Sequence, residues 1–187
     1  MGFVTKRNII IGGIVLVVLI GLATGAFFLW QHNRTATVDS TDTSAPQSSN
    51  GSSLTDAQVA LSDKVTKVLG SEGTEEAAKV LDQELTTTTD AADKSFIYTL
   101  KMGLETGKPS PDYAVALDYA LKADEADPTF DSALNVADIA YIASKYDVAK
   151  QYYQLYLDRS VTASGEQLDP AARPYYEARL KELGGAS

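Results

Sequence analysis

The sequence contains no cysteine and a single histidine, His32. The missing thiols exclude disulfides, thiolate nucleophiles, iron–sulfur clusters and lipid attachment through an N-terminal cysteine. Because the histidine directly follows an N-terminal apolar run, the remainder of the chain lacks the imidazole of a Ser-His-Asp triad or a histidine metal site. None of the motifs GxxxxGK[ST], GxGxxG and HExxH occurs. We therefore expect no catalytic residues, no cofactor and no bound metal.

Positive charge is also scarce, since 16 Lys and Arg stand against 25 Asp and Glu and the net charge is −9. Residues 1–50 carry Lys6, Arg7 and Arg34 against two aspartates, a sum of +1, which leaves −10 for the rest. Nucleic-acid binders need a basic surface to displace counterions from phosphate backbones. The charge distribution therefore argues against a nucleic-acid partner.

The longest apolar run covers residues 9–30 and contains no charged side chain. As a helix it would be roughly 33 Å long, which matches a hydrocarbon core of about 30 Å. We expect a transmembrane helix here, preceded by a short tail of residues 1–8. A cleaved signal peptide ending near Ala26 is the alternative, although the apolar run exceeds the usual length of such a leader.

Basic residues near its two ends predict the orientation of this helix. Lys6 and Arg7 precede the run and only Arg34 follows it closely. The positive-inside rule then places the N-terminus in the cytoplasm and the C-terminal domain outside it, at a cell surface or in a periplasm. Gly21 and Gly25 form a GxxxG motif, through which two such helices could pair as a homodimer, although glycine is common in membrane helices by chance.

Residues 31–53 are rich in Ser and Thr and offer almost nothing apolar to bury. Such a composition cannot offset the entropy lost on ordering and favours disorder. We expect a flexible linker that holds the domain of residues 54–187 about 25 Å from the membrane.

After residue 54 the sequence indicates an all-α fold, because apolar residues recur at spacings of three and four between short breakers. Helices are expected at residues 54–69, 74–86, 91–106, 111–125, 130–144, 146–159 and 169–183. Pro128 and Pro170, each preceded by Asp, are expected in the first turns of the helices that follow, with Asp as the N-cap.

A period of 33 residues is visible, because YAVALDY from Tyr113 recurs as YDVAKQY from Tyr146. The stretch YAVALDYALKADEADP, residues 113–128, resembles the second helix of the tetratricopeptide repeat family, with Ala116 and Ala123 at its small-residue positions. The resemblance implies antiparallel helix hairpins stacked into a solenoid of about three repeats, closed by a C-terminal capping helix.

The resemblance also implies that a concave surface, lined by the first helix of each hairpin, binds an extended peptide or a partner's helix. On the helix predicted at 130–144, Asp131, Leu134, Asp138 and Tyr141 fall at spacings of three and four and are the candidate partner-binding residues. The alternative is that this stripe is only solvated surface. Its two aspartates favour a basic or amide-rich ligand.

Most of the tyrosines are expected to pack hairpin against hairpin rather than to bind a ligand. All ten lie after residue 97, and the repeat positions are occupied by Tyr113, Tyr119, Tyr146 and Tyr152.

The sequence thus predicts a membrane-anchored protein-interaction module, acting in a secretion, envelope or cell-surface assembly. A self-associating structural component of the envelope or surface is the alternative. A carboxylate-dependent hydrolase is a weaker one, because it would need two acids paired across a pocket.

Overall fold

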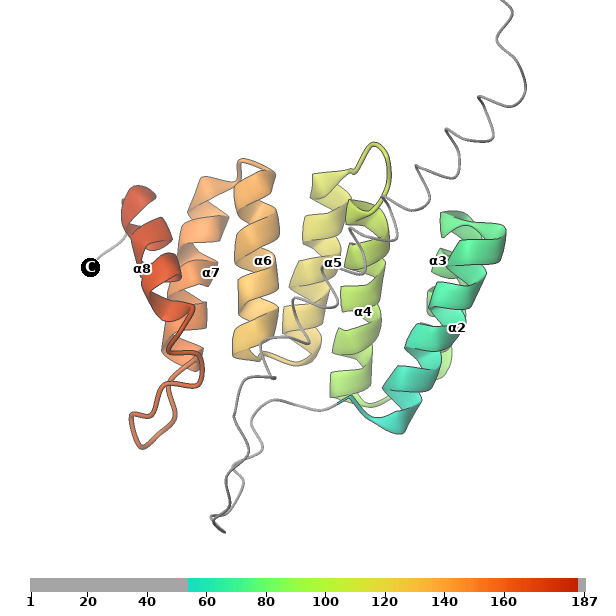
Figure 1. Ribbon diagram of the computed structural model, residues 1–187, viewed down its shortest axis with the longest axis horizontal. Helices are drawn as coiled ribbons and strands as arrows, with labels where there is room; N and C mark the ends of the chain where they lie inside the picture. Colours follow the sequence, from blue (N-terminus) through green and yellow to red (C-terminus); the bar gives the residue numbers. More distant parts are fainter. Residues whose placement is uncertain (1–53, 185–187) are drawn as a thin grey trace, which may run out of the picture. The chain divides into compact units, whose positions relative to one another are not determined.

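Seven α-helices follow one another in the computed structural model, which describes residues 54–184 (Figure 1). They are α2 (Asp56–Glu72), α3 (Thr74–Thr87), α4 (Ala91–Thr106), α5 (Tyr113–Ala126), α6 (Phe130–Ile142), α7 (Tyr146–Arg159) and α8 (Arg173–Glu182). Within this range the only β-type pairing is an isolated bridge between Val161 and Gln167. The predicted all-α class is confirmed for these residues, and each predicted helix has its counterpart.

Several predictions fall outside the described residues. They are the tail 1–8, the transmembrane helix 9–30, the linker 31–53 and the helix-pairing residues Gly21 and Gly25. From residue 54 to residue 184, none of the helices combines the length and the apolar character needed to cross a bilayer.

The helices form a row in which each packs chiefly on its neighbours in sequence (Figure 1). Helices α2 and α3, α4 and α5, and α6 and α7 form three hairpins, and α8 packs on α7 at the end of the row. This arrangement is consistent with a helical solenoid, in which each unit is stabilised mainly by the units beside it.

Side-chain caps fix several helix starts and correct two predictions. Thr129 caps α6, because its hydroxyl accepts from the Ser132 N–H at 3.0 Å while the Ser132 hydroxyl accepts from the Thr129 N–H at 2.9 Å. Pro128 therefore precedes the cap and is not in the first turn. Similarly, α8 begins at Arg173, so Pro170 lies in the preceding turn and Pro174 occupies the first turn instead. A capping hydroxyl accepts a hydrogen bond from a backbone N–H of the first turn that would otherwise have no partner. A proline in the first turn only lacks such an N–H, so it does not by itself fix where the helix begins.

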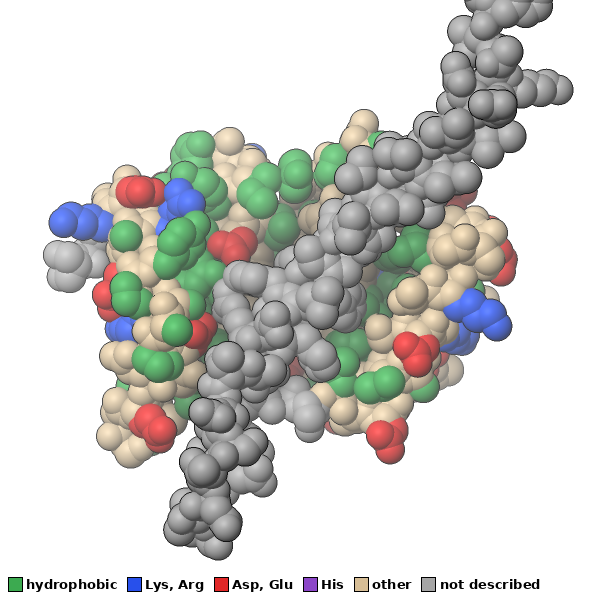
Figure 2. All heavy atoms as spheres, viewed as in Figure 1, with side chains coloured by type: hydrophobic (Ala, Val, Ile, Leu, Met, Phe, Trp, Pro, Cys, Tyr) green, Lys and Arg blue, Asp and Glu red, His purple; other side chains and the backbone are tan. Residues whose placement is uncertain are grey.

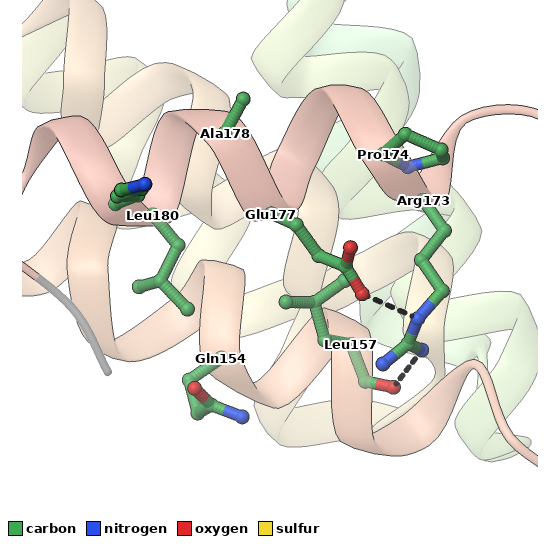
Figure 3. A pocket seen from close by; sticks show the side chains of 8 residues that line it. Gln154, Leu157, Arg173, Pro174, Glu177, Ala178 and Leu180 are labelled. Carbon is green, nitrogen blue, oxygen red and sulfur yellow. Dashed lines mark hydrogen bonds and ion pairs between the residues drawn. The ribbon is translucent and has the colours of Figure 1, made fainter. Parts of the chain in front are cut away.

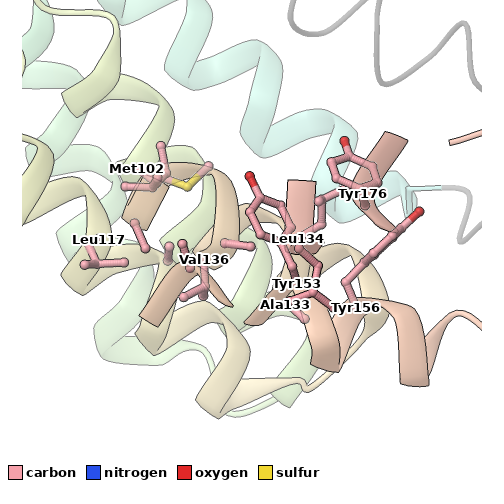
Figure 4. Packing of buried hydrophobic residues seen from close by; sticks show 14 of the residues in the cluster. Met102, Leu117, Ala133, Leu134, Val136, Tyr153, Tyr156 and Tyr176 are labelled. Atoms are coloured by element: carbon pink, nitrogen blue, oxygen red, sulfur yellow. The ribbon is translucent and has the colours of Figure 1, made fainter. Parts of the chain in front are cut away.

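The main core lies between α4 and α8 and depends on alanines where helices approach closely (Figure 4). The predicted small-residue positions Ala116 and Ala123 are both buried, and α6 adds three more fully buried alanines, Ala133, Ala137 and Ala140. Small side chains allow neighbouring helix axes to come close, so that larger residues beside them interdigitate.

A second, smaller core joins the first hairpin to α4. It consists of Val65, Ala77, Leu81 and Ile97, which are buried, together with partly buried leucines and valines around them. Its buried residues are distinct from those of the main core, so α2 and α3 depend on their own cluster.

The tyrosines are distributed differently from the prediction. Tyr153, Tyr156 and Tyr176 are buried, whereas Tyr146 is 51% exposed. Tyr113, Tyr119 and Tyr152 are only half-buried. Tyr146 is the first residue of α7, just after the turn, and therefore lies at the edge of the packed region rather than inside it.

Candidate interaction surface

The four predicted partner-binding residues do not share one open face. Asp131 is exposed, Asp138 and Tyr141 are half-buried, and Leu134 is only 4% exposed and belongs to the main core. Helix α6 is packed between α5 and α7, and seven of its 13 residues are buried. A helix enclosed in this way exposes a narrower strip than spacing alone predicts, so Leu134 offers almost no surface to a partner.

Asp138 has a structural partner in the neighbouring helix. The Tyr153 hydroxyl donates a hydrogen bond of 2.8 Å to its carboxylate, which joins α6 to α7. Burial, reinforced by the negative charge of Asp138, raises the pKa of Tyr153 well above its usual value. The phenol therefore keeps its proton and the link persists throughout the neutral pH range.

Tyr141 belongs to a cluster on three helices that the sequence analysis did not bring together. The cluster consists of Tyr141 from α6, Tyr146 from α7, and Tyr175 and Arg179 from α8, and we call it the tyrosine–arginine patch. Arg179 donates hydrogen bonds to the hydroxyls of Tyr141 at 3.0 Å and Tyr175 at 2.7 Å. Its guanidinium carbon lies 4.5 Å and 5.3 Å from the centroids of the same two rings.

The aromatic rings of the patch are packed against neighbouring rings yet remain exposed to solvent. Tyr146 packs against Tyr141 edge to face, with the ring centroids 5.7 Å apart, and Tyr175 packs in the same way on the buried Tyr176 at 5.0 Å. Nevertheless, Tyr146 is 51% and Tyr175 is 56% exposed. Figure 2 shows hydrophobic side chains gathered at the upper left, over α6, α7 and α8. Aromatic rings and arginine that are both accessible and held in place are typical of interface hot spots.

The electrostatics of the patch are set by Arg179. Its hydrogen bond to Tyr175 raises the pKa of the guanidinium further above its usual value, so it is charged at every relevant pH. Glu182 lies 3.1 Å from the same guanidinium and balances its charge. The arginine therefore fixes the orientation of the Tyr141 and Tyr175 rings.

A signal for part of the patch was present in the sequence. Tyr175 and Arg179 are four residues apart on the predicted capping helix and therefore share a face. Tyr141 and Tyr146 come from a different hairpin, and no local pattern predicts that α8 brings Arg179 onto Tyr141, which is 38 positions earlier.

A different polar cluster lies at the opposite end of α6. The buried carboxylate of Asp124 forms an ion pair with Arg159 and accepts a hydrogen bond of 2.6 Å from the Ser132 hydroxyl. Arg159 also donates to the Thr129 carbonyl at 3.0 Å. These contacts tie α5, α6 and α7 together, and every group in them has a structural partner.

A surface hollow of about 500 Å³ lies between α7 and α8 (Figure 3). Arg173 crosses it, with one hydrogen bond of 2.8 Å to Glu177 and another of 3.1 Å to the Leu157 carbonyl. Glu177 is the only carboxylate among the lining residues, so this hollow does not contain the pair of acids that glycoside hydrolysis requires.

Across residues 54–184, no group of three or more His, Asp and Glu side chains is placed to hold a metal ion. Comparison with known proteins adds no assignment, since no family model matches the chain and no curated protein is recovered as a relative.

Proposed function

We propose that this chain is a protein-interaction module of the tetratricopeptide-like kind, anchored in a membrane through residues 9–30. Its stacked hairpins hold the tyrosine–arginine patch rigidly, and a partner protein docks there. The exposed tyrosine rings fixed by Arg179 are the observation that carries this proposal, because exposed aromatic surface of this kind marks interaction sites.

The order of the helices supports the tetratricopeptide-like assignment. Three hairpins that pack chiefly on their neighbours and a final single helix correspond to about three repeats and a cap. The buried Ala116 and Ala123 occupy the positions that the resemblance assigns to close helix contact. Asp138 on α6 accepts a hydrogen bond from Tyr153 of α7, whose ring stacks on Tyr176, the residue on which Tyr175 of the patch packs.

Docking can be tested by photocrosslinking in the full-length protein within its native membrane. A photoreactive phenylalanine in place of Tyr146 is expected to crosslink to one distinct protein. The same group in place of Leu121, which is also exposed but lies on α5, provides the matched control and is expected to give no such product. An Arg179→Ala change should weaken the Tyr146 product, because the rings lose the group that orients them.

Two results would contradict docking of a different protein at the patch. One is a crosslink only to a second copy of the chain, which would favour the self-associating alternative. The other is equal yield from the Tyr146 and Leu121 positions.

The proposed membrane topology has its own test. A protease added to intact cells, or to spheroplasts where an outer membrane encloses a periplasm, should degrade the domain of residues 54–187 and leave the N-terminal tail protected. Protection of the domain in spheroplasts, or in cells without an outer membrane, until they are lysed would place it on the cytoplasmic side, against the positive-inside prediction.

A further inference from the structure

The tyrosine hydroxyls of the patch have unused hydrogen-bond donors. A phenol offers one O–H donor and two acceptor lone pairs. Arg179 donates to the oxygens of both Tyr141 and Tyr175, so these bonds use acceptor capacity only. Among the described residues, neither of the two O–H groups donates to another protein atom. The patch therefore presents aromatic faces together with two donors that suit carbonyl oxygens of a ligand.

The charges around the patch select against an anionic ligand. Arg179 is already balanced by Glu182, and its guanidinium lies against two rings. Asp138 on α6 and the exposed Asp147 at the start of α7 add negative charge, while Lys145 adds one positive charge. With a net charge of −9 on the whole chain, complementarity favours a cationic segment over a phosphorylated or acidic one.

The backbone of residues 54–184 also restricts the mode of recognition. It contains no β-strand to which a partner strand could be added, so main-chain pairing at a sheet edge is not available in this range. A polyproline II segment needs no such edge. Its carbonyl groups are free acceptors, its pyrrolidine rings pack on aromatic faces, and it loses little entropy because it is already extended.

On the basis of the proposed function, we infer that the docked segment is an extended, proline-containing peptide with basic flanking residues. Its pyrrolidine rings pack against Tyr146 and Tyr175, and its carbonyls accept from the hydroxyls of Tyr141 and Tyr175. The basic flanks are attracted to the acidic surface around the patch.

The test uses the full-length protein and a synthetic peptide of nine prolines with two lysines at each end, measured by fluorescence anisotropy. A Kd on the order of 100 µM is expected, because a short peptide fills only a few contacts. A peptide with alanines in place of the prolines keeps the charge and should bind at least about tenfold more weakly.

Two substitutions separate the hydroxyls from the rings. Tyr175→Phe keeps the ring but removes the hydroxyl, which is both the proposed donor to the peptide and the acceptor for Arg179. It should weaken binding about fivefold. Tyr175→Ala also removes the ring and should weaken binding more than about tenfold. Tyr113→Phe is the matched control, because Tyr113 lies on α5 outside the patch, and it should leave the affinity unchanged.

The outcomes distinguish this inference from the proposed function. Equal binding of the alanine peptide, or no effect of either Tyr175 substitution, overturns the proline-specific mode even where crosslinking from Tyr146 identifies a protein partner. Self-association that Tyr146→Ala abolishes would identify a second copy as the occupant and overturn the inference as well. If the full-length protein neither binds the proline peptide nor crosslinks from position 146 to a different protein, both the inference and the proposed function are contradicted.

Discussion

Buried polar side chains between the packed helices are paired by hydrogen bonds. Between residues 54 and 184, every buried side-chain nitrogen or oxygen makes a hydrogen bond. Asp124 is the clearest case, because its buried carboxylate is matched by a guanidinium and a hydroxyl from two other helices. Removing one partner would leave a charge in a poorly solvated place, which costs more than the bond itself contributes.

Arg159→Met should therefore destabilise the protein by about 2 kcal/mol, because Asp124 stays buried with its ion-pair partner gone. Lys122→Met provides the control, since the ion pair of Lys122 with Asp118 is solvent-exposed and its loss should cost about 0.5 kcal/mol or less. Urea unfolding of the full-length protein measures both values. Equal effects of the two substitutions would contradict the structural role of Asp124.

Tyr153 gives a pH-dependent prediction. Its pKa is raised in the folded protein by burial and by Asp138, so the folded state resists ionisation. The unfolded chain ionises this phenol near a pKa of about 10. The stabilisation is thus complete below about pH 10 and is lost as the pH rises further, because only the unfolded state then releases the proton.

Tyr153→Phe should remove this contribution to the alkaline loss and cost about 1 kcal/mol at neutral pH through the missing hydrogen bond to Asp138. The measurement is the free energy of unfolding between pH 7 and 11 for both proteins. A Tyr113→Phe protein should follow the wild-type curve. Parallel curves for the Tyr153→Phe and wild-type proteins would show that the burial of Tyr153 does not govern the alkaline loss.

Helix boundaries depend on a few residues, and Gly73 between α2 and α3 is the sharpest example. Its φ of 93° and ψ of −179° fall in a region that residues with a Cβ rarely adopt. Gly73→Ala should cost about 1–3 kcal/mol through backbone strain. Gly70→Ala is the matched control, because Gly70 lies inside α2 with open space around it, and there alanine should stabilise by up to about 1 kcal/mol. Thermal unfolding should show a lower melting temperature for Gly73→Ala and a higher one for Gly70→Ala. A lower melting temperature in both variants would contradict this account.

The separate core of the first hairpin predicts a separate opening event. Leu81 is fully buried among residues of α2, α3 and α4, apart from the main cluster. Leu81→Ala should reduce the amide exchange protection of α2 and α3 by about 2–3 kcal/mol while α6 and α7 keep theirs. Hydrogen exchange followed by mass spectrometry measures each helix. A uniform loss of protection along the row would show that the stack opens as one unit.

The helices could be predicted from sequence because breakers and apolar spacing are local properties. Gly73 marks the start of α3, and the predicted starts of α4, α6 and α7 agree with the structure. The caps were harder, because Thr129 and Asp127 both suit an N-cap and only geometry shows that the threonine hydroxyl reaches the third N–H. The patch could not be predicted as a unit, since the approach of α8 to α6 is decided by how α7 packs between them.

The acidity of the molecule as a whole governs which partners it meets. With a net charge of −9, it should not retard duplex DNA in an electrophoretic assay at physiological salt. Its association with the basic peptide should weaken as ionic strength rises, because the attraction is screened over about 8–10 Å. Retardation of DNA, or binding that is insensitive to salt, would contradict this electrostatic picture.

The packing of each helix chiefly on its neighbours in sequence also determines how the molecule reaches its native state. Because contacting helices are close in sequence, a forming hairpin has little loop entropy to lose. Domains with such low contact order fold within microseconds to milliseconds. A chain of this kind can order each hairpin as it emerges from the ribosome, so its early segments need not wait for distant residues before acquiring structure.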